Sequence, residues 1–422
     1  MNGALRGSLV RGITRNVVLL GIVSLLTDVS SELLVYVVPL FLANVLAATP
    51  TVIGIVEGVA ESVAAFVKLG SGVLSDRIRR RTVLVGTGYG ASVAAKALYV
   101  VAASWPVVLL ARVGDRVGKG IRTAPRDALI ADSIEPGARG RAFGLHRAMD
   151  TVGAVIGVAL AAAIVGATQG DAVLIEAETF RLLALAALVP GLLALVVIAA
   201  GVRDVPRPER TPVAPATAPA ARPGGGFPAP FWVFVAAVGI FTLGNSSDAF
   251  VALRSQALGV SVRDLLLVVI AFNVVDAVVA WPVGALSDRI GRRRLLALGW
   301  GLYAATYAGF ALAGGAAAVL PLWLLYGAYY GVNEAVGRAL VADLARPELR
   351  ATAYGIVNAV TGLAILAASI VAGLLWDGVG QAAPFWFGAA CAVGGIVLLA
   401  FVRPARAKGT AGTGAGRVPA PP

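Results

Sequence analysis

The sequence predicts an all-α membrane protein whose twelve transmembrane helices form two related halves of six. Three observations support this fold class. Apolar residues make up 58% and charged residues 14% of the 422 residues, and the mean hydropathy of +0.85 is far above that of soluble domains. Twelve apolar runs are long enough to cross the roughly 30 Å hydrocarbon core of a bilayer as helices. Short motifs of the first half also recur in the second half.

The apolar runs follow one another with short links. They lie near residues 14 to 42, 50 to 75, 82 to 104, 106 to 131, 140 to 167 and 179 to 201 in the first half, and near 230 to 257, 262 to 286, 294 to 315, 319 to 343, 350 to 375 and 384 to 402 in the second. The runs are too long for membrane strands and do not alternate, so helices rather than a barrel satisfy the backbone amides in lipid.

The domain organisation follows from the position of the polar segments. Residues 1–201 form the expected first bundle and residues 230–403 the second. Residues 202–229 are rich in Pro, Ala, Gly and Arg, which is typical of a flexible linker. Residues 404–422 are expected to be a disordered tail. The basic amino-terminal residues lead into a long apolar run without a cleavage site, so we expect them to be retained.

The distribution of arginine predicts the topology. Nearly all loop arginines fall on one side of the expected membrane, whereas the opposite loops hold only Arg181 and Arg263. Since cytoplasmic loops carry an excess of Lys and Arg, both termini are expected in the cytoplasm, and the protein in a bacterial cytoplasmic (inner) membrane. The net charge of +12 is then explained by topology and by anionic lipid. It does not indicate nucleic-acid binding, because no basic patch with interleaved aromatic residues is visible.

Cysteine and histidine usage excludes several kinds of chemistry. The single cysteine, Cys391, and the single histidine, His146, rule out a disulfide framework and leave too few ligands for an ordinary zinc site. We therefore expect no metal and no cofactor. No nucleophile with a base accompanies these residues, which argues against an intramembrane enzyme. A phosphate-binding G-x-x-x-x-G-K-[ST] motif is also absent, so an ion gradient rather than ATP is the expected energy source.

Three motifs repeat at nearly constant spacing. GVLSDRI at residues 72–78 matches GALSDRI at 284–290, ALIAD at 128–132 matches ALVAD at 339–343, and AFG at 142–144 matches AYG at 353–355. The offsets are 212, 211 and 211 residues. Collinear matches of this kind indicate two parallel repeats, an arrangement that occurs in secondary transporters.

The repeated segment resembles the signature of the major facilitator superfamily, G-x-L-a-D-r-x-G-r-r between helices two and three. The second copy, residues 284–293, fits throughout, whereas the first has Arg79 where the family usually has Gly. The resemblance implies alternating access with cytoplasmic gates at these helix ends. The gate candidates are Gly72, Asp76, Arg77, Arg80, Gly284, Asp288, Arg289 and Arg292. An equally weighted alternative is that they order the loops and anchor the topology.

Two further motifs resemble those of drug/proton antiporters in part. Residues 116–124 match R-x-x-q-G-x-x-x-A of proton-linked members, with Lys119 in place of Gln. Helix five matches the antiporter motif only through Gly144, Gly153 and Gly157, and Val158 stands where Pro is expected. The resemblance implies export, although glycines spaced by four also allow helices to pack closely for any transporter.

Charged residues inside the expected helices are the candidates for coupling or substrate binding, because each costs at least roughly 3 kcal/mol near the bilayer centre. They are Asp28, Glu32, Glu57, Glu61, Lys68, Lys96, Arg112, Asp115, Arg116, Lys119, Arg147, Asp150, Asp248 and Asp276. In the first half cations and acids nearly balance, which predicts a network of ion pairs. Much of this set is therefore expected to be structural.

Asp28 and Glu32 are the leading candidates for proton coupling. They lie one helical turn apart, and Asp28 is about 20 Å into its helix, at the depth where transporters bind. A carboxylate there can change its protonation with conformation, or can form a static salt bridge. Lysine usage adds a second hypothesis: of the four lysines, Lys68, Lys96 and Lys119 lie in membrane helices. Either one of them titrates during transport, or a compact charge simply fits there.

The second half is poorer in charge. Its neutral polar candidates for substrate contact or for helix packing are Asn245, Asn273, Asn333, Asn358, Trp281 and Tyr329, and Glu334 with Arg338 has the spacing of an ion pair. We expect coupling in the first half and recognition shared between the halves.

The expected function is proton-coupled export of a hydrophobic or cationic small molecule. One alternative is ion-coupled transport of an organic anion along the basic stripe of helix four, with sodium as another coupling ion. Another is a membrane sensor that transports nothing. The expected partners are a small-molecule substrate, protons and membrane lipid, without nucleic acid or an obligatory protein partner.

Overall fold

The computed structural model describes residues 13–77, 80–135, 138–205, 226–346 and 349–402. Within these ranges every regular element is a helix, so the prediction of an all-α fold is confirmed. The expected linker and tail fall largely on residues 206–225 and 403–422, which lie outside the described residues.

The helices follow the predicted order. The first half contains α2 (Arg15–Val35), α3 (Val37–Asn44), α4 (Pro50–Arg77), α5 (Arg81–Val100), α6 (Trp105–Asp132), α7 (Arg139–Thr168) and α8 (Ala177–Gly201). The second contains α9 (Ala229–Gly244), α10 (Ala249–Ala257), α11 (Val262–Ile290), α12 (Arg292–Leu312), a 3-10 turn η2 (Ala316–Ala318), α13 (Val319–Leu344), α14 (Arg350–Gly378) and α15 (Ala383–Phe401). The expected single helices at 14 to 42 and 230 to 257 are each interrupted, and otherwise twelve helical spans appear as predicted.

Length and composition of the helices suit a bilayer. Nine segments of described residues are long and apolar enough to cross a membrane. α6 does not meet this criterion because charged residues are spread along it between Arg112 and Asp132, yet it packs lengthwise against α4 and α5. The outer face of α8 is apolar and exposed, with Leu185, Val189 and Val196 among its exposed residues. Apolar side chains in such positions are stable only against hydrocarbon.

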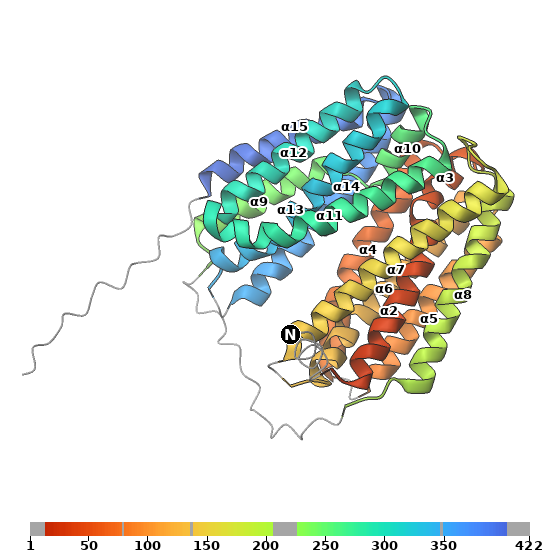
Figure 1. Cartoon of the computed structure of the whole chain (residues 1–422). Coiled ribbons are helices and arrows are strands. Elements are labelled where there is room, and N and C mark those ends of the chain that lie inside the picture. Colours follow the sequence, from red (N-terminus) through yellow and green to blue (C-terminus); the bar gives the residue numbers. More distant parts are fainter. Residues whose placement is uncertain (1–12, 78–79, 136–137, 206–225, 347–348, 403–422) are drawn as a thin grey trace, which may run out of the picture.

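Each half is a bundle with the same internal arrangement. In the first, α2 packs against α7 and α8, α4 against α6, and α5 against α6 and α8; in the second, α9 packs against α14 and α15, α11 against α13, and α12 against α13 and α15. The halves touch through α4 with α14 and through α7 with α11. Because the repeat pairs α4 with α11 and α7 with α14, exchanging the halves converts one contact into the other. The fold is therefore two six-helix repeats related by an approximate twofold axis (Figure 1).

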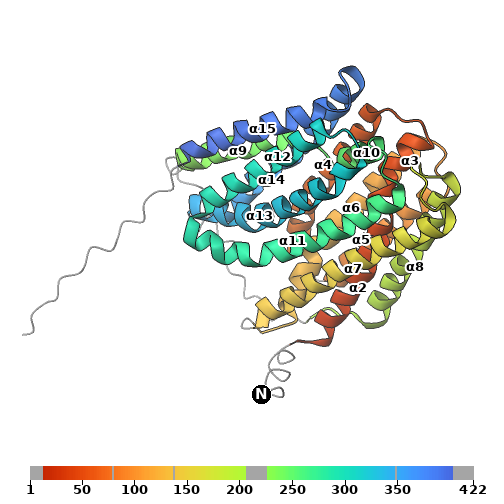
Figure 2. The same cartoon turned by 45° about the horizontal axis from the view of Figure 1, so that its top comes forward.

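The basic end of the molecule is defined here as the end that holds the arginine-rich loops after α4, α6, α11 and α13, and the other is called the opposite end. The two bundles meet near α3 and α10 at the opposite end and diverge toward the basic end (Figures 1 and 2). One apolar cluster extends across both halves. A second cluster, which includes Val17, Tyr89 and Ile130, is confined to the first half.

At the opposite end α4 and α14 are in backbone contact. A Cβ on Gly54 would overlap the carbonyl oxygen of Ser369, so only glycine fits there. Thr51 donates from its amide and its hydroxyl to Asp377 Oδ2, at 3.0 and 2.5 Å. These contacts fix the halves together where α4 begins and α14 ends.

The second contact between the halves also lies at the opposite end. The amide of Val262, at the start of α11, donates to the carbonyl of Ala172 at 3.1 Å. Arg263 donates to Asp171 Oδ1 at 3.0 Å, and Gln256 donates to the carbonyl of Val173 at 2.6 Å. The loop between α7 and α8 is thus tied to the second half, and the molecule is closed at the opposite end.

Candidate functional site

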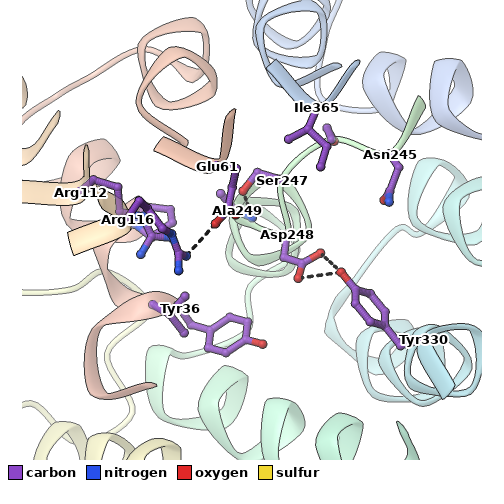
Figure 3. Close-up of a pocket in the computed structure, with 13 residues that line it drawn as sticks. Tyr36, Glu61, Arg112, Arg116, Asn245, Ser247, Asp248, Ala249, Tyr330 and Ile365 are labelled. Atoms are coloured by element: carbon purple, nitrogen blue, oxygen red, sulfur yellow. Dashed lines mark hydrogen bonds and ion pairs between the residues drawn. The ribbon is translucent and has the colours of Figure 1, made fainter. Parts of the chain in front are cut away.

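A cavity of about 270 Å³ lies between the halves and is called the central cavity. It is lined by Val35, Tyr36, Pro39, Glu61, Arg112, Arg116, Asn245, Ser246, Ser247, Asp248, Ala249, Tyr330 and Ile365. Glu61 is eleven residues into α4, about 17 Å from the opposite end, and therefore near the middle of a bilayer core. Figure 3 shows that both halves contribute walls to this cavity.

The two helix interruptions form part of these walls. α2 ends at Val35 because the ring of Pro39 conflicts with the carbonyl four residues earlier and Pro39 cannot donate to it. α9 ends at Gly244, which packs against Gly388 and Cys391 with no room for a Cβ. The Ser-Ser-Asp sequence that follows favours non-helical local hydrogen bonds, and the hydroxyl of Ser247 accepts from the amide of Ala249 at 3.3 Å.

The first-half wall carries two ion pairs between α4 and α6. Arg112 donates from Nε and Nη2 to Glu57 Oε2 at 3.2 and 2.7 Å. Arg116 Nη2 lies 2.7 Å from Glu61 Oε1. The two acids are four residues apart on α4, and the two arginines that bind them are four residues apart on α6. The predicted acidic face of α4 therefore meets the predicted basic stripe of α6 in register. Glu57 is 2% exposed, and its pairing offsets the cost of burial.

Lys96 and Asp115 form a third buried group. Lys96 Nζ donates to the hydroxyls of Ser30 and Ser31, both at 2.9 Å, and lies 3.9 Å from Asp115 Oδ1. Lys96 and Asp115 are 3% and 6% exposed. This cation therefore links α5 to α2 and α6. The two serines were not anticipated from the sequence, because a hydroxyl inside an apolar helix gives no signal of its own there.

A second cavity, of about 440 Å³, lies between α2, α7 and α11 and is called the lateral cavity. It is lined by Asp28, Arg147, Asp150, Thr151, Ala154, Asn273, Asp276, Ala277 and Ala280. Asp150 Oδ2 also lies 3.4 Å from Nδ1 of His146. Three carboxylates and one arginine line this cavity, so its lining is more acidic than basic.

Asp28, Glu32 and Lys119 differ from the paired residues. In the part of the chain that the structure describes, the side chain of none of the three forms a hydrogen bond or an ion pair within 4 Å. Lys119, which is exposed, acts electrostatically on both carboxylates. Glu32 packs against α7: a Cβ added to Gly157 would lie only 2.8 Å from the Cβ of Glu32. The predicted charge network thus divides into residues that form direct ion pairs and a set without direct partners, Asp28, Glu32 and Lys119, which is called the open group. Lys68 belongs to neither and is exposed on α4.

Asp248 lies at the interruption between α9 and α10. Its Oδ1 accepts from the hydroxyl of Tyr326 at 2.7 Å, and the hydroxyl of Tyr330 lies 3.1 and 3.2 Å from its two oxygens (Figure 3). Sequence reasoning named Asp248 but missed these tyrosines. Tyr326 and Tyr330 share a face of α13 at a spacing of four residues, which was the available signal. Tyr329, which was named instead, is 1% exposed and packs against Phe241 and Tyr326.

A third cavity, of about 330 Å³, lies inside the second half and is called the second-half cavity. It is lined by Phe234, Val238, Phe241, Thr242, Asn245, Leu296, Trp300, Tyr330, Asn333, Gly337, Arg338, Val341, Tyr354, Val357, Asn358, Thr361 and Ile365. Three of the four predicted asparagines reach it, and Asn273 lines the lateral cavity instead. Asn333 Oδ1 accepts from the indole of Trp300 at 3.2 Å. The side chains of Trp281 and Glu334 lie outside the described residues.

The gate candidates are placed at the basic end. The surroundings of Gly72 and Gly284 and the side chains of Asp76, Arg77 and Asp288 are outside what the structure describes. Arg80 and Arg289 are exposed. Gly291 has a φ of 92° where α11 ends, a conformation that favours glycine.

Arg292 acts inside its own half. It donates to Asp343 Oδ1 at 2.5 Å and so joins α12 to α13. Arg81 and Asp132 form the equivalent ion pair in the first half, again at an offset of 211 residues. An arginine at the end of each repeated signature, Arg81 in the first copy and Arg292 in the second, thus binds the aspartate of the repeated ALxAD motif in the same half.

Comparison with known proteins agrees with this architecture. The sequence profile described as Major Facilitator Superfamily matches residues 20–253 and 231–422. An uncharacterized MFS-type transporter of Methanocaldococcus jannaschii is 33% identical over 399 residues, which covers 93% of this chain and 96% of the relative.

Two further similarities are more limited. A tetracenomycin C resistance and export protein of Streptomyces glaucescens is 30% identical over 156 residues, covering 36% of this chain and 29% of that protein. A crystal structure of a bacterial homolog of the human lysosomal transporter Spinster superposes with a TM-score of 0.70 at 16% identity, over 95% of this chain and 96% of that one.

Proposed function

The chain belongs to the major facilitator superfamily, and from that membership we propose that it exports a small organic molecule in exchange for protons. As a member of this family it is an integral membrane transporter of small molecules and not an enzyme. Its charged residues and cavities support two further steps of the proposal, namely the coupling ion and the charge of the substrate.

The observation that carries the proposal is the open group formed by Asp28, Glu32 and Lys119. The acids of α4 are bound directly by arginines, whereas Asp28 and Glu32 face a lysine without contacting it within the described part of the chain. Both carboxylates are half-buried, and partial burial without a direct partner makes the ionised form costly, so a carboxylate in this position exchanges a proton when its surroundings change. Coupling requires a group of this kind.

The charge of the cavities supports a cationic rather than an anionic substrate. The lateral cavity has three acids and one arginine in its walls. In the central cavity Arg112 and Arg116 are held by Glu57 and Glu61, which neutralise them. The organic-anion alternative retains one supporting observation, the exposed Lys119 on α6.

The direction of transport and the membrane topology are further parts of the proposal. The similarity to a protein named for resistance and export supports export, over the matched third of the chain. We place the basic end in the cytoplasm, because the positive-inside rule favours it. Bundles 1–201 and 230–403 would then rock about the central cavity, and the described conformation, closed at the opposite end, would be the one that receives substrate from the cytoplasm.

Proton movement in everted membrane vesicles tests the proposal. Vesicles that contain the wild type, Asp28→Asn, Glu32→Gln or the control Asp264→Asn are energised and then exposed to a panel of drugs and organic anions. Asp264 is an exposed acid in the first turn of α11, so its replacement matches the charge change away from the cavities. We expect one or more cationic compounds to dissipate the pH gradient in vesicles that contain the wild type or the control. The same compounds should fail to dissipate it with Asp28→Asn, with Glu32→Gln, or with both.

Two results would contradict parts of the proposal. If labelled substrate exchanges equally in all four proteins and no compound moves protons, proton coupling is excluded and Asp28 and Glu32 are structural. If only organic anions move protons, the anion alternative replaces the cationic one. Accumulation of labelled compound inside the everted vesicles establishes export, and the absence of any substrate-dependent flux would favour a sensor.

A further inference from the structure

The two helix interruptions are equivalent positions of the repeat. Tyr36 separates α2 from α3, and Asp248 ends the break between α9 and α10. The two residues are 212 apart, which is the offset of the repeated signature. Both side chains line the central cavity. Discontinuous helices at the middle of a transporter are where ligands bind, because backbone and polar side chains become accessible there.

Asp248 has hydrogen-bond donors but no counter-ion. The hydroxyls of Tyr326 and Tyr330 donate to it, and no cationic side chain lies within 4 Å among the described residues. Glu61 and Glu57, which are acids, act on it electrostatically, and the arginines of the same cavity, Arg112 and Arg116, are paired with these two acids. A half-buried carboxylate with acidic neighbours and no paired cation is costly when ionised. A positive group on a ligand removes that cost.

Aromatic rings complete a receptor for such a group. Tyr36 reaches from the first half toward the place where Asp248 and Tyr330 meet (Figure 3), and all three line the same cavity. An ammonium that lies against aromatic rings is attracted by their π-electron faces, more strongly when it is desolvated. On the facing wall the charge of Arg116 is balanced by Glu61 at 2.7 Å, so repulsion of a cation is reduced.

The central cavity adjoins the second-half cavity. Asn245, Tyr330 and Ile365 line both. Beyond these shared residues the walls include Trp300 and Phe241, which stack on one another with ring centroids 4.5 Å apart. The side chain of Asn358 also faces this space. An apolar or ring-bearing group fits these walls, and an amide can hold one polar atom of it.

We propose that Asp248 is the counter-ion of a positively charged substrate group, and that the apolar body of the same substrate lies in the second-half cavity. The substrate class is therefore an amphipathic organic cation, and its charge is recognised by the second half rather than by Asp28 and Glu32. This inference rests on the proposed transport function and names its substrate class. It adds a division of roles: proton exchange at the first-half carboxylates and substrate charge at Asp248.

Binding to the purified full-length protein tests the inference without a gradient or flux. The probes are benzyltrimethylammonium, its neutral isostere neopentylbenzene, in which carbon replaces nitrogen, and tetramethylammonium, which has the charged group without the ring. Affinities are measured by calorimetry for the wild type, Asp248→Asn and Asp264→Asn. We expect the wild type and Asp264→Asn to prefer benzyltrimethylammonium over neopentylbenzene by at least about tenfold, and Asp248→Asn to lose that preference.

A second variant tests the place of the ring. Asn358→Trp fills the second-half cavity from an exposed position. It is expected to weaken benzyltrimethylammonium by at least about tenfold and to leave tetramethylammonium unchanged. Unchanged melting temperature and monodispersity show that the variants are folded.

Three outcomes overturn the inference. These are a wild type that prefers the neutral probe, an Asp248→Asn variant that keeps the preference for the cation, and an Asn358→Trp variant that binds the ring-bearing cation normally. Failure of the proposed function is distinguishable, because it leaves these binding results intact while protons do not move in vesicles. Conversely, proton-coupled transport that depends on Asp28 or Glu32 but binds no cation at Asp248 overturns only this inference.

Discussion

Replacement of Gly54 by alanine should shift the molecule away from the conformation that is closed at the opposite end. A Cβ at this position would overlap the carbonyl oxygen of Ser369 and would lie 2.9 Å from its carbonyl carbon and 3.3 Å from Phe250 Cζ. Optimal separations between carbon atoms are about 3.5–4.0 Å. The obstructing atoms belong to the backbone of α14, which cannot rotate away, so α4 and α14 must separate.

The expected size of the shift follows from the cost of overpacking. Inserting one methyl group into a well-packed contact costs about 1–3 kcal/mol. Only the conformation in which α4 and α14 touch here bears this cost. The ratio of the two conformations should therefore change by about 5- to 150-fold in favour of the one that is open at the opposite end. Gly70→Ala is the matched control, because Gly70 lies on the same helix and a Cβ there meets no atom within 4 Å.

Distances between spin labels measure the shift. In a Cys391→Ala background, cysteines at Gly140 and Arg294 place one label on each half at the basic end, where both positions are exposed. We expect a shorter distance to gain population in Gly54→Ala and the distribution in Gly70→Ala to match the parent. An unchanged distribution in Gly54→Ala, or the same change in both variants, would refute the argument that this glycine contact holds the closed conformation.

Two further predictions concern stability, measured by the reaction of Cys391, the single cysteine, with a thiol-reactive dye on heating. Glu57→Gln leaves Arg112 without its ionised partner in a site where both side chains are nearly inaccessible, so it should destabilise the protein by about 3–5 kcal/mol; a melting temperature equal to that of Asp264→Asn would show that the pair is not structural. Arg254→Met removes three hydrogen bonds, two of them to the carbonyls of Phe310 and Ala313 at the end of α12, and should cost about 1–3 kcal/mol; a variant as stable as the wild type would indicate that other donors replace them.

Some properties of the site were accessible from the sequence because they depend on local composition. Charged residues in apolar helices identified Asp28, Glu61 and Asp248 as candidates, since each is costly in lipid wherever it points. The near balance of cations and acids indicated ion pairs, and the pairs of α4 with α6 agree with it. The four-residue spacing of Tyr326 and Tyr330 indicates only that they share a face of α13. Their hydroxyls become donors to Asp248 when α13 packs beside the break after α9, which no local signal predicts.

The sequence by itself determined the class of fold and its repeat. Apolar length decides which segments cross the bilayer, arginine decides how the loops are distributed, and the repeated motifs reveal two halves. All three depend on residues read along the chain. The three signals agree on two halves of six helices, and none of them requires knowing which helices are in contact.

Only the tertiary structure decided which acids are bound and which are open. The pair Asp28 and Glu32 and the pair Glu57 and Glu61 have the same spacing on apolar helices, and nothing local distinguishes them. α6 lies against α4, so its arginines bind the second pair directly. The first pair faces Lys119 without contact. The distinction depends on the rotation and register of one helix against another, which is set by packing over the whole bundle rather than by any single stretch of sequence.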